Sequence, residues 1–172
     1  MSAATQRVRT AAARGAGVPG LVRLEVQRRV SGWSPSRREL ALWASTAAGK
    51  RAAGRELGLR VVGAAESRRL NAHFRGRDRP TNVLSFAPSR LPRAAASAPL
   101  PLGDLVICAR VLRAEARAHD RTLKAHWAHL VVHGTLHLIG YDHERRTDAQ
   151  RMERREVAVL KRLGFANPYR SL

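Results

Sequence analysis

The amino-acid sequence predicts an α+β fold. We expect one domain in which a roughly four-stranded mixed sheet packs against about five helices, with a metal site at the end of a central helix. Four short apolar stretches have the length and composition of strands, and they do not alternate strictly with the helical patterns between them. The longest helical pattern carries a row of histidines and ends near Gly140. The 172 residues contain no internal repeat and are enough for one hydrophobic core.

The strand-like patterns indicate different degrees of burial for the predicted strands. The first alternates apolar and polar residues at Val22, Leu24 and Val26, which indicates one buried face. The second is apolar almost throughout, so we expect it in the interior of the sheet. The predicted strands cover residues 21–30, 57–63, 81–86 and 103–108.

Helix boundaries are indicated by capping and breaking residues. Pro35 falls in the first turn of the first helix, and Thr122 is a suitable N-cap for the long central helix. Thr147 or Asp148 is expected to cap the last helix, which Gly164 ends. The predicted helices cover about 35–49, 64–74, 109–119, 123–140 and 148–163.

Two segments outside these elements are expected to be irregular. Residues 1–20 contain three arginines and no acid, so we expect a disordered basic tail ahead of a single domain at residues 21–170. An organellar transit peptide is the alternative for this tail. Residues 87–101 contain four prolines and are expected to form a surface loop.

Cysteine content and hydropathy bear on the compartment. The single cysteine, Cys108, excludes an intramolecular disulfide and ends an apolar run, so we expect it to be buried in a reducing environment. No stretch is apolar for the length of a membrane span. We therefore expect a cytoplasmic protein without a membrane partner.

The charge balance points to polyanionic partners. Lys and Arg number 32 against 13 acidic residues, which gives a net charge of +19. Such an excess favours RNA or DNA as partner, with an anionic membrane as a second candidate. A general bias towards arginine in the proteome is the alternative explanation.

Three histidines with regular spacing predict a metal site. His133 and His137 lie one helical turn apart, and His143 follows in the turn beyond Gly140. Three imidazole ligands leave a position for water, which is typical of a catalytic zinc site. We expect one zinc ion per chain, although other divalent ions are possible. His126 and His129 lie further back on the same helix and are expected to pack or to support the ligands.

One residue in this motif argues against a peptidase. The spacing coincides with that of the metzincin proteases, H-E-x-x-H-x-x-G-x-x-H, but Gly134 stands where those proteases have the glutamate that acts as general base. The pattern therefore favours a metal hydrolase other than a peptidase. Asp142 and Glu144 are candidate proton acceptors, or else capping and solvated turn residues.

An arginine-rich loop offers positive charge for a phosphodiester substrate. Arg75, Arg77 and Arg79 stand beside a glycine and a proline, ahead of a predicted strand. Arginine can stabilise the charge that develops on phosphoryl oxygens, and it binds phosphate groups bidentately. A solvated charged turn is the structural alternative.

Three stretches resemble one family. Residues 74–86 (FRGRDRPTNVLSF) closely resemble the YRGKDKPTNVLSF segment of the YbeY-type rRNA maturation endoribonucleases. Residues 102–108 (LGDLVIC) are similar to the LGD(I/L)VIC strand of this family. Residues 126–144 match its histidine signature almost position by position, and Pro168-Tyr169 resembles its closing PY.

The resemblance implies a metal-dependent endoribonuclease that prefers single strands. Such enzymes act in small-subunit rRNA 3′-end maturation and ribosome quality control in the cytoplasm, so ribosomal proteins or an assembly GTPase are possible partners. It also implies that His133, His137 and His143 bind zinc and that Arg75 is functionally required. Arg77 and Arg79 are then expected to hold backbone phosphates of the RNA.

Two other functions remain as alternatives. The protein could be an RNA-binding ribosome assembly factor that zinc stabilises and that has little intrinsic cleavage activity. A metallopeptidase is the weaker alternative, because Gly134 replaces the catalytic glutamate.

Overall fold

The computed structural model describes residues 21–88, 100–142 and 145–170. The predicted tail at 1–20 and most of the predicted proline-rich loop lie outside this part of the chain. In chain order the elements are β1 (Arg23–Arg28), α1 (Arg37–Ala48), the 3₁₀ helix η1 (Gly49–Ala52), β2 (Glu56–Val62), α2 (Ala64–Arg75), β3 (Val83–Phe86), β4 (Pro101–Cys108), α3 (Ala109–Ala118), α4 (Leu123–Leu138) and α5 (Arg146–Arg162).

A mixed sheet of four strands organises the fold. Its order is β1-β2-β4-β3, with β1, β2 and β4 parallel and β3 antiparallel to β4. The predicted α+β class, the mixed sheet and the interior position of the second strand are therefore confirmed. Since β3 pairs only with β4, it forms one edge of the sheet.

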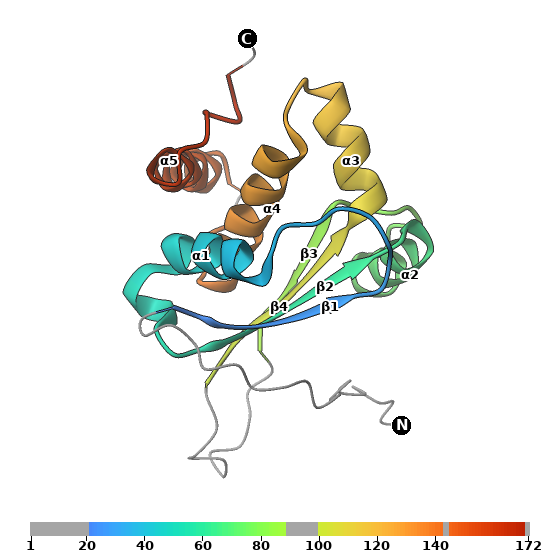
Figure 1. The fold of residues 1–172 in the computed structure, drawn as a ribbon, viewed down its shortest axis with the longest axis horizontal. Helices are drawn as coiled ribbons and strands as arrows, with labels where there is room; N and C mark the ends of the chain where they lie inside the picture. The colour runs from blue at the N-terminus through green and yellow to red at the C-terminus, as the bar shows by residue number, and fades with distance from the viewer. Residues whose placement is uncertain (1–20, 89–99, 143–144, 171–172) are drawn as a thin grey trace.

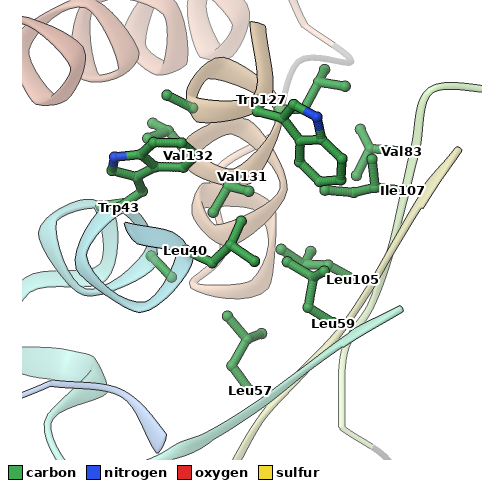
Figure 2. Close-up of a cluster of buried hydrophobic side chains, with 14 of the residues drawn as sticks. Leu40, Trp43, Leu57, Leu59, Val83, Leu105, Ile107, Trp127, Val131 and Val132 are labelled. Atoms are coloured by element: carbon green, nitrogen blue, oxygen red, sulfur yellow. The ribbon is translucent and has the colours of Figure 1, made fainter. Parts of the chain in front are cut away.

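One face of the sheet carries the main core. Helices α1 and α4 cover this face, and α5 packs outside them (Figure 1). Figure 2 shows Leu40 and Trp43 of α1 meeting Val131 and Val132 of α4 above the sheet. The sheet contributes alternate residues to the same cluster, namely Leu57, Leu59, Val83, Leu105 and Ile107. Helix α4 lies between α1, α5, α3 and the sheet, as expected for the central helix.

The opposite face carries a smaller cluster beneath α2. Val62, Leu84, Val106 and Cys108 are buried there, with residues of α2 packed against them. Cys108 is completely buried, as its sequence context predicted. Helices α2 and α4 thus lie on opposite faces of the sheet.

Several boundaries differ from the prediction by one to three residues. Helix α1 begins at Arg37, because Ser36 caps it and forms a capping box with Glu39, so Pro35 precedes the helix. Helix α5 begins at Arg146, which puts the two predicted caps inside its first turn. Strand β4 begins at Pro101, where the edge of a loop was predicted.

None of the helices in the described ranges is long and apolar enough to cross a membrane.

A carboxylate on the α2 side of the sheet occupies space that a glycine leaves open. Gly58 and Asp104 are paired across β2 and β4, and a Cβ built on Gly58 would lie 2.1 Å from Asp104 Oδ1. Asp104 is exposed on one side, but loss of solvent around its carboxylate raises its pKa, and this effect outweighs the attraction of Arg60. Glu25 beside it raises the pKa further. The charged form of Asp104 is therefore less stable in the folded protein than in water.

Replacing Asp104 by Asn is expected to stabilise the protein in a pH-dependent way. An acid whose folded pKa is raised reduces stability above that pKa, and the effect disappears below the unfolded pKa of about 3.9. Thermal unfolding should show a higher midpoint than wild type at pH 7 and no difference near pH 3. Asp78→Asn is the control, and it should lower the midpoint at pH 7. The reason is that the ion pair with Arg68 lowers the pKa of Asp78. Equal midpoints for Asp104→Asn and wild type at both pH values would contradict this account.

Candidate metal centre

Helix α4 presents four histidines along one stripe. Thr122 caps the helix, with its hydroxyl oxygen accepting the N–H of Ala125 at 3.2 Å, and Gly140 follows the helix in a left-handed conformation at φ 96°. At roughly 100° per residue the stripe spans an arc of about 80° on the helix surface. The four residues are His126, His129, His133 and His137.

Gly134 brings α4 against the sheet. A Cβ built at this position would lie 2.7 Å from Leu105 Cδ2 and 3.1 Å from Ser85 Oγ, both of which belong to the sheet. The Ser85 hydroxyl donates a hydrogen bond to the Gly134 carbonyl at 3.3 Å. Position 134 therefore faces the sheet, where a larger side chain would clash with Leu105 and Ser85.

His133 and His137 direct one nitrogen each to a common point. Their Nε2 atoms are 3.2 Å apart. Two imidazole nitrogens on one tetrahedral ion, each about 2.0–2.1 Å from it, would be separated by about 3.3–3.4 Å. The pair therefore has the spacing that a shared metal ion requires.

A buried carboxylate from α5 holds the other nitrogen of His133. Glu156 is completely buried, and its Oε1 atom lies 2.6 Å from His133 Nδ1. If Nδ1–H donates this bond, the lone pair of His133 is on Nε2 and faces His137. Carboxylate–histidine pairs of this kind orient histidines that bind metals.

The second oxygen of Glu156 has its own partners. It accepts the Tyr169 hydroxyl and lies 3.5 Å from His129 Nε2. Burial by itself raises the pKa of Glu156, but the nearby His129 ring and the hydrogen bonds with His133 and Tyr169 together lower it to about 2. Burial and the neighbouring carboxylate raise the pKa of Tyr169, which keeps its hydroxyl protonated. Glu156 is therefore an anion compensated by hydrogen bonds.

A second combination of ligands is also available. His129, His133 and Glu156 each offer an atom within 4.8 Å of the others and could hold a metal ion. Burial lowers the pKa of His129, which keeps the ring neutral as a metal ligand must be. This combination shares His133 with the pair that includes His137, so the two sets of ligands are alternatives.

Residues near the C-terminus pack beside His129 and Glu156. The guanidinium of Arg121 donates to the Pro168 carbonyl, and the Tyr169 N–H donates to Asn167 Oδ1 at 2.9 Å. The Tyr169 ring packs edge-on against the His129 ring at 5.7 Å. The segment thus fixes the tyrosine that holds Glu156.

His126 belongs to a separate polar group. Its Nε2 atom lies 2.9 Å from Glu115 Oε2, and Asn82 donates to both oxygens of the same carboxylate. His126 is buried, and this group ties α3 and α4 to the start of β3. These contacts are those of a packed side chain, which is one of the two roles expected for His126.

The structure describes only some of the other predicted site residues. His143 and Glu144 lie outside the described residues. Arg75 is exposed at the end of α2, on the opposite face of the sheet from α4. Arg77 and Arg79 are exposed in the loop that follows α2, and Asn71 donates to the Arg79 carbonyl. No hydrogen bond or ion pair within the described ranges joins Arg75 to a histidine.

Glu156 and Tyr169 were not predicted as site residues. A signal for Glu156 existed, because it occupies a buried position on α5 together with Met152, Val159 and Leu160. A charged residue among core positions of a helix is uncommon unless it has a partner. The sequence could not identify that partner, since it lies on another helix.

Comparison with known proteins gives one family and one fold. The family model described as Endoribonuclease YbeY matches residues 36–164. Among solved structures, the chain is similar to the solution structure of TM1509 from Thermotoga maritima. The two share 24% identity and a TM-score of 0.50, over 83% of this chain and 91% of that chain. At this identity the likeness supports the fold alone.

Replacing Gly134 by Glu is expected to disrupt the fold without creating a peptidase. The new carboxylate would enter the core beside Leu105 and Ser85 and would have no room there. Burying an unpaired charge and overpacking the core should together destabilise the protein by more than about 3 kcal/mol. Chemical denaturation measures the change. A stable Gly134→Glu protein that cleaves casein would contradict the orientation described above.

Replacing Glu156 by Gln is expected to weaken metal binding. The amide keeps the shape but removes the charge that orients His133, and such changes weaken binding by about 10–100-fold. Competition with a chromogenic chelator measures the affinity for Zn²⁺, and thermal unfolding checks the fold. Glu153→Gln is the matched control, because Glu153 is exposed on the same helix. Unchanged zinc affinity in a folded Glu156→Gln protein would count against an orienting role.

Proposed function

The chain belongs to the YbeY endoribonuclease family, as its motifs predicted, and from this premise we propose that it cuts single-stranded RNA with one bound metal ion. The proposed setting is small-subunit rRNA 3′-end maturation and ribosome quality control in the cytoplasm. The observation that supports metal-dependent chemistry most directly is the 3.2 Å separation of the Nε2 atoms of His133 and His137. The bond from Glu156 to His133 supports it further.

The proposed ligands are His133, His137 and His143, with zinc as the metal. This choice leaves Glu156 as the residue that orients His133, since its two oxygens already accept hydrogen bonds from His133 and Tyr169. A zinc ion held there would act as a Lewis acid towards a phosphodiester oxygen and would acidify water at neutral pH. The protein's part is to orient the imidazoles towards such an ion, as Glu156 does for His133.

Arg75 is proposed to stabilise charge on the phosphodiester, although it lies on the other side of the edge strand β3 from the histidines. Residues of β3 point alternately to the two faces of the sheet. Ser85 bonds to Gly134 next to His133, while Phe86 packs against Phe74, the neighbour of Arg75, with ring centroids 4.8 Å apart. The end of α2 and the metal-binding turn of α4 therefore flank the same strand. An RNA strand crossing this edge would meet both.

The excess of basic residues supports an RNA substrate. A net charge of +19 attracts a polyanion, and exposed Arg77 and Arg79 extend the positive surface next to Arg75. Ribosomal proteins or an assembly GTPase are proposed as partners that direct this general affinity to one RNA site.

A set of histidine variants tests the proposed ligands and the activity together. His137→Ala should lose stoichiometric zinc and RNA cleavage, whereas His129→Ala should keep zinc within a few-fold of wild-type affinity. Zinc is measured by plasma emission spectrometry, and cleavage by gel analysis of a single-stranded RNA. Zinc loss in His129→Ala with retention in His137→Ala would favour the His129–His133–Glu156 combination instead. Wild type that binds RNA but never cleaves it at any metal loading would favour an assembly factor.

Replacing Arg75 by Ala is expected to lower turnover and leave metal binding intact. Removal of one group that stabilises transition-state charge typically reduces turnover by about 100-fold or more. Arg69→Ala is the matched control, since Arg69 is exposed on the same helix. Loss of zinc or of thermal stability in Arg75→Ala would show that the arginine is structural.

A further inference from the structure

The loop between β1 and α1 displays a tryptophan among arginines. Residues 28–38 read RRVSGWSPSRR, with four arginines, no acid and Trp33 at the centre. Trp33 is 51% exposed, whereas the other two tryptophans, Trp43 and Trp127, are 3% and 1% exposed. Isolated exposed apolar residues are common on proteins, so the argument depends on what surrounds Trp33.

Hydrogen bonds and packing hold the loop in place on both sides of Trp33. Arg28 donates from Nε to Ser34 Oγ at 2.8 Å and from its terminal nitrogen to the Pro35 carbonyl at 2.7 Å. Pro35 is buried, and Val30 packs against the main core. The loop therefore buries Pro35 and packs Val30 against the core, but it leaves its largest side chain, that of Trp33, facing solvent.

Helix α3 supports the loop from the other side. The Arg113 guanidinium donates to the Ser31 carbonyl at 3.4 Å, and a Cβ on Gly32 would lie only 2.8 Å from it. Gly32 has φ 113°, a conformation that side chains rarely adopt. The close approach places a guanidinium directly beside the main chain next to Trp33. Figure 1 shows this loop running between the end of the sheet and the start of α1, past α3.

The positive charge of this surface is uncompensated. Over the described ranges, no carboxylate lies within ion-pair distance of Arg28, Arg29, Arg38 or Arg113. Glu39, the nearest acid in sequence, is paired with Lys124 at 2.7 Å. An exposed apolar ring on a loop flanked by arginines that form no ion pair among the described residues suits a ligand that carries both flat aromatic groups and negative charge.

Single-stranded RNA has both properties. Its unpaired bases can stack on an exposed aromatic ring, while arginines bind the phosphates between them. Duplex RNA keeps its bases stacked inside the helix and offers no free face. We propose that Trp33 is a base-stacking platform of a binding site for single-stranded RNA, formed with Arg29, Arg38 and Arg113. The choice of RNA as ligand rests on the proposed endoribonuclease function.

Intrinsic fluorescence can report on this site directly, because the other two tryptophans are buried. A 12-nucleotide oligouridylate is titrated into the full chain, and gels verify that the RNA remains intact. We expect quenching of the wild-type emission by the single strand and little quenching by a duplex of equal length. Trp33→Phe should bind within about threefold of wild type but lose the response. Trp33→Ala should bind about 5- to 100-fold more weakly, the range seen for loss of one base stack.

Charge variants provide an independent measure. Arg29 and Arg38 make no side-chain hydrogen bond in the described part of the chain, so Gln at both positions should leave the fold intact. If each arginine neutralises one phosphate, the double variant should reduce the salt slope of log K by about 1.4. Leu42→Ala, at a residue 46% exposed on α1, is the control for loss of apolar surface.

The possible failures are distinguishable. Trp33→Ala that binds oligouridylate as tightly as wild type overturns the inference, even if the protein cleaves RNA. A blue shift with phosphatidylserine vesicles and no response to RNA assigns Trp33 to a membrane surface and also overturns it. Quenching by intact RNA, in a protein that never cleaves single-stranded RNA in the separate cleavage assay at any metal loading, supports the binding site while contradicting the proposed nuclease function.

Discussion

The contact of α4 with the sheet at Gly134 is the constraint on which the histidine site depends. The absence of a side chain lets the helix lie against Leu105 and Ser85. This contact fixes the rotation of α4 about its axis, and His133 and His137 then project to one flank, about 60–100° from the sheet. A bulkier residue would lift or turn the helix and move both imidazoles away from α5.

Glu156 shows how a charge can be retained in the interior. A buried carboxylate without partners would be protonated or would destabilise the fold. Here hydrogen bonds from two other parts of the chain, α4 and the C-terminal segment, lower its pKa to about 2. The same bonds restrict the orientation of His133, so the stability of the anion and the geometry of the site have one origin.

The sheet separates the histidines from the arginine-rich end of α2. Both groups nevertheless border β3, whose residues alternate between the two faces. An edge strand is accessible from the side, which a central strand is not. The proposed path of the RNA across this edge follows from the topology rather than from a pocket between the two groups.

By itself the sequence determined the α+β class, the four strands, the central helix and the spacing of His133 and His137. These features depend on local periodicity and capping, which are encoded by neighbouring residues. It also identified Gly134 as unusual, but assigned its effect to a missing base. Only the tertiary structure revealed that position 134 faces the core, that Glu156 meets His133 from 23 residues away and that α2 lies on the far face. Those facts depend on how helices pack around the sheet, which no local pattern specifies.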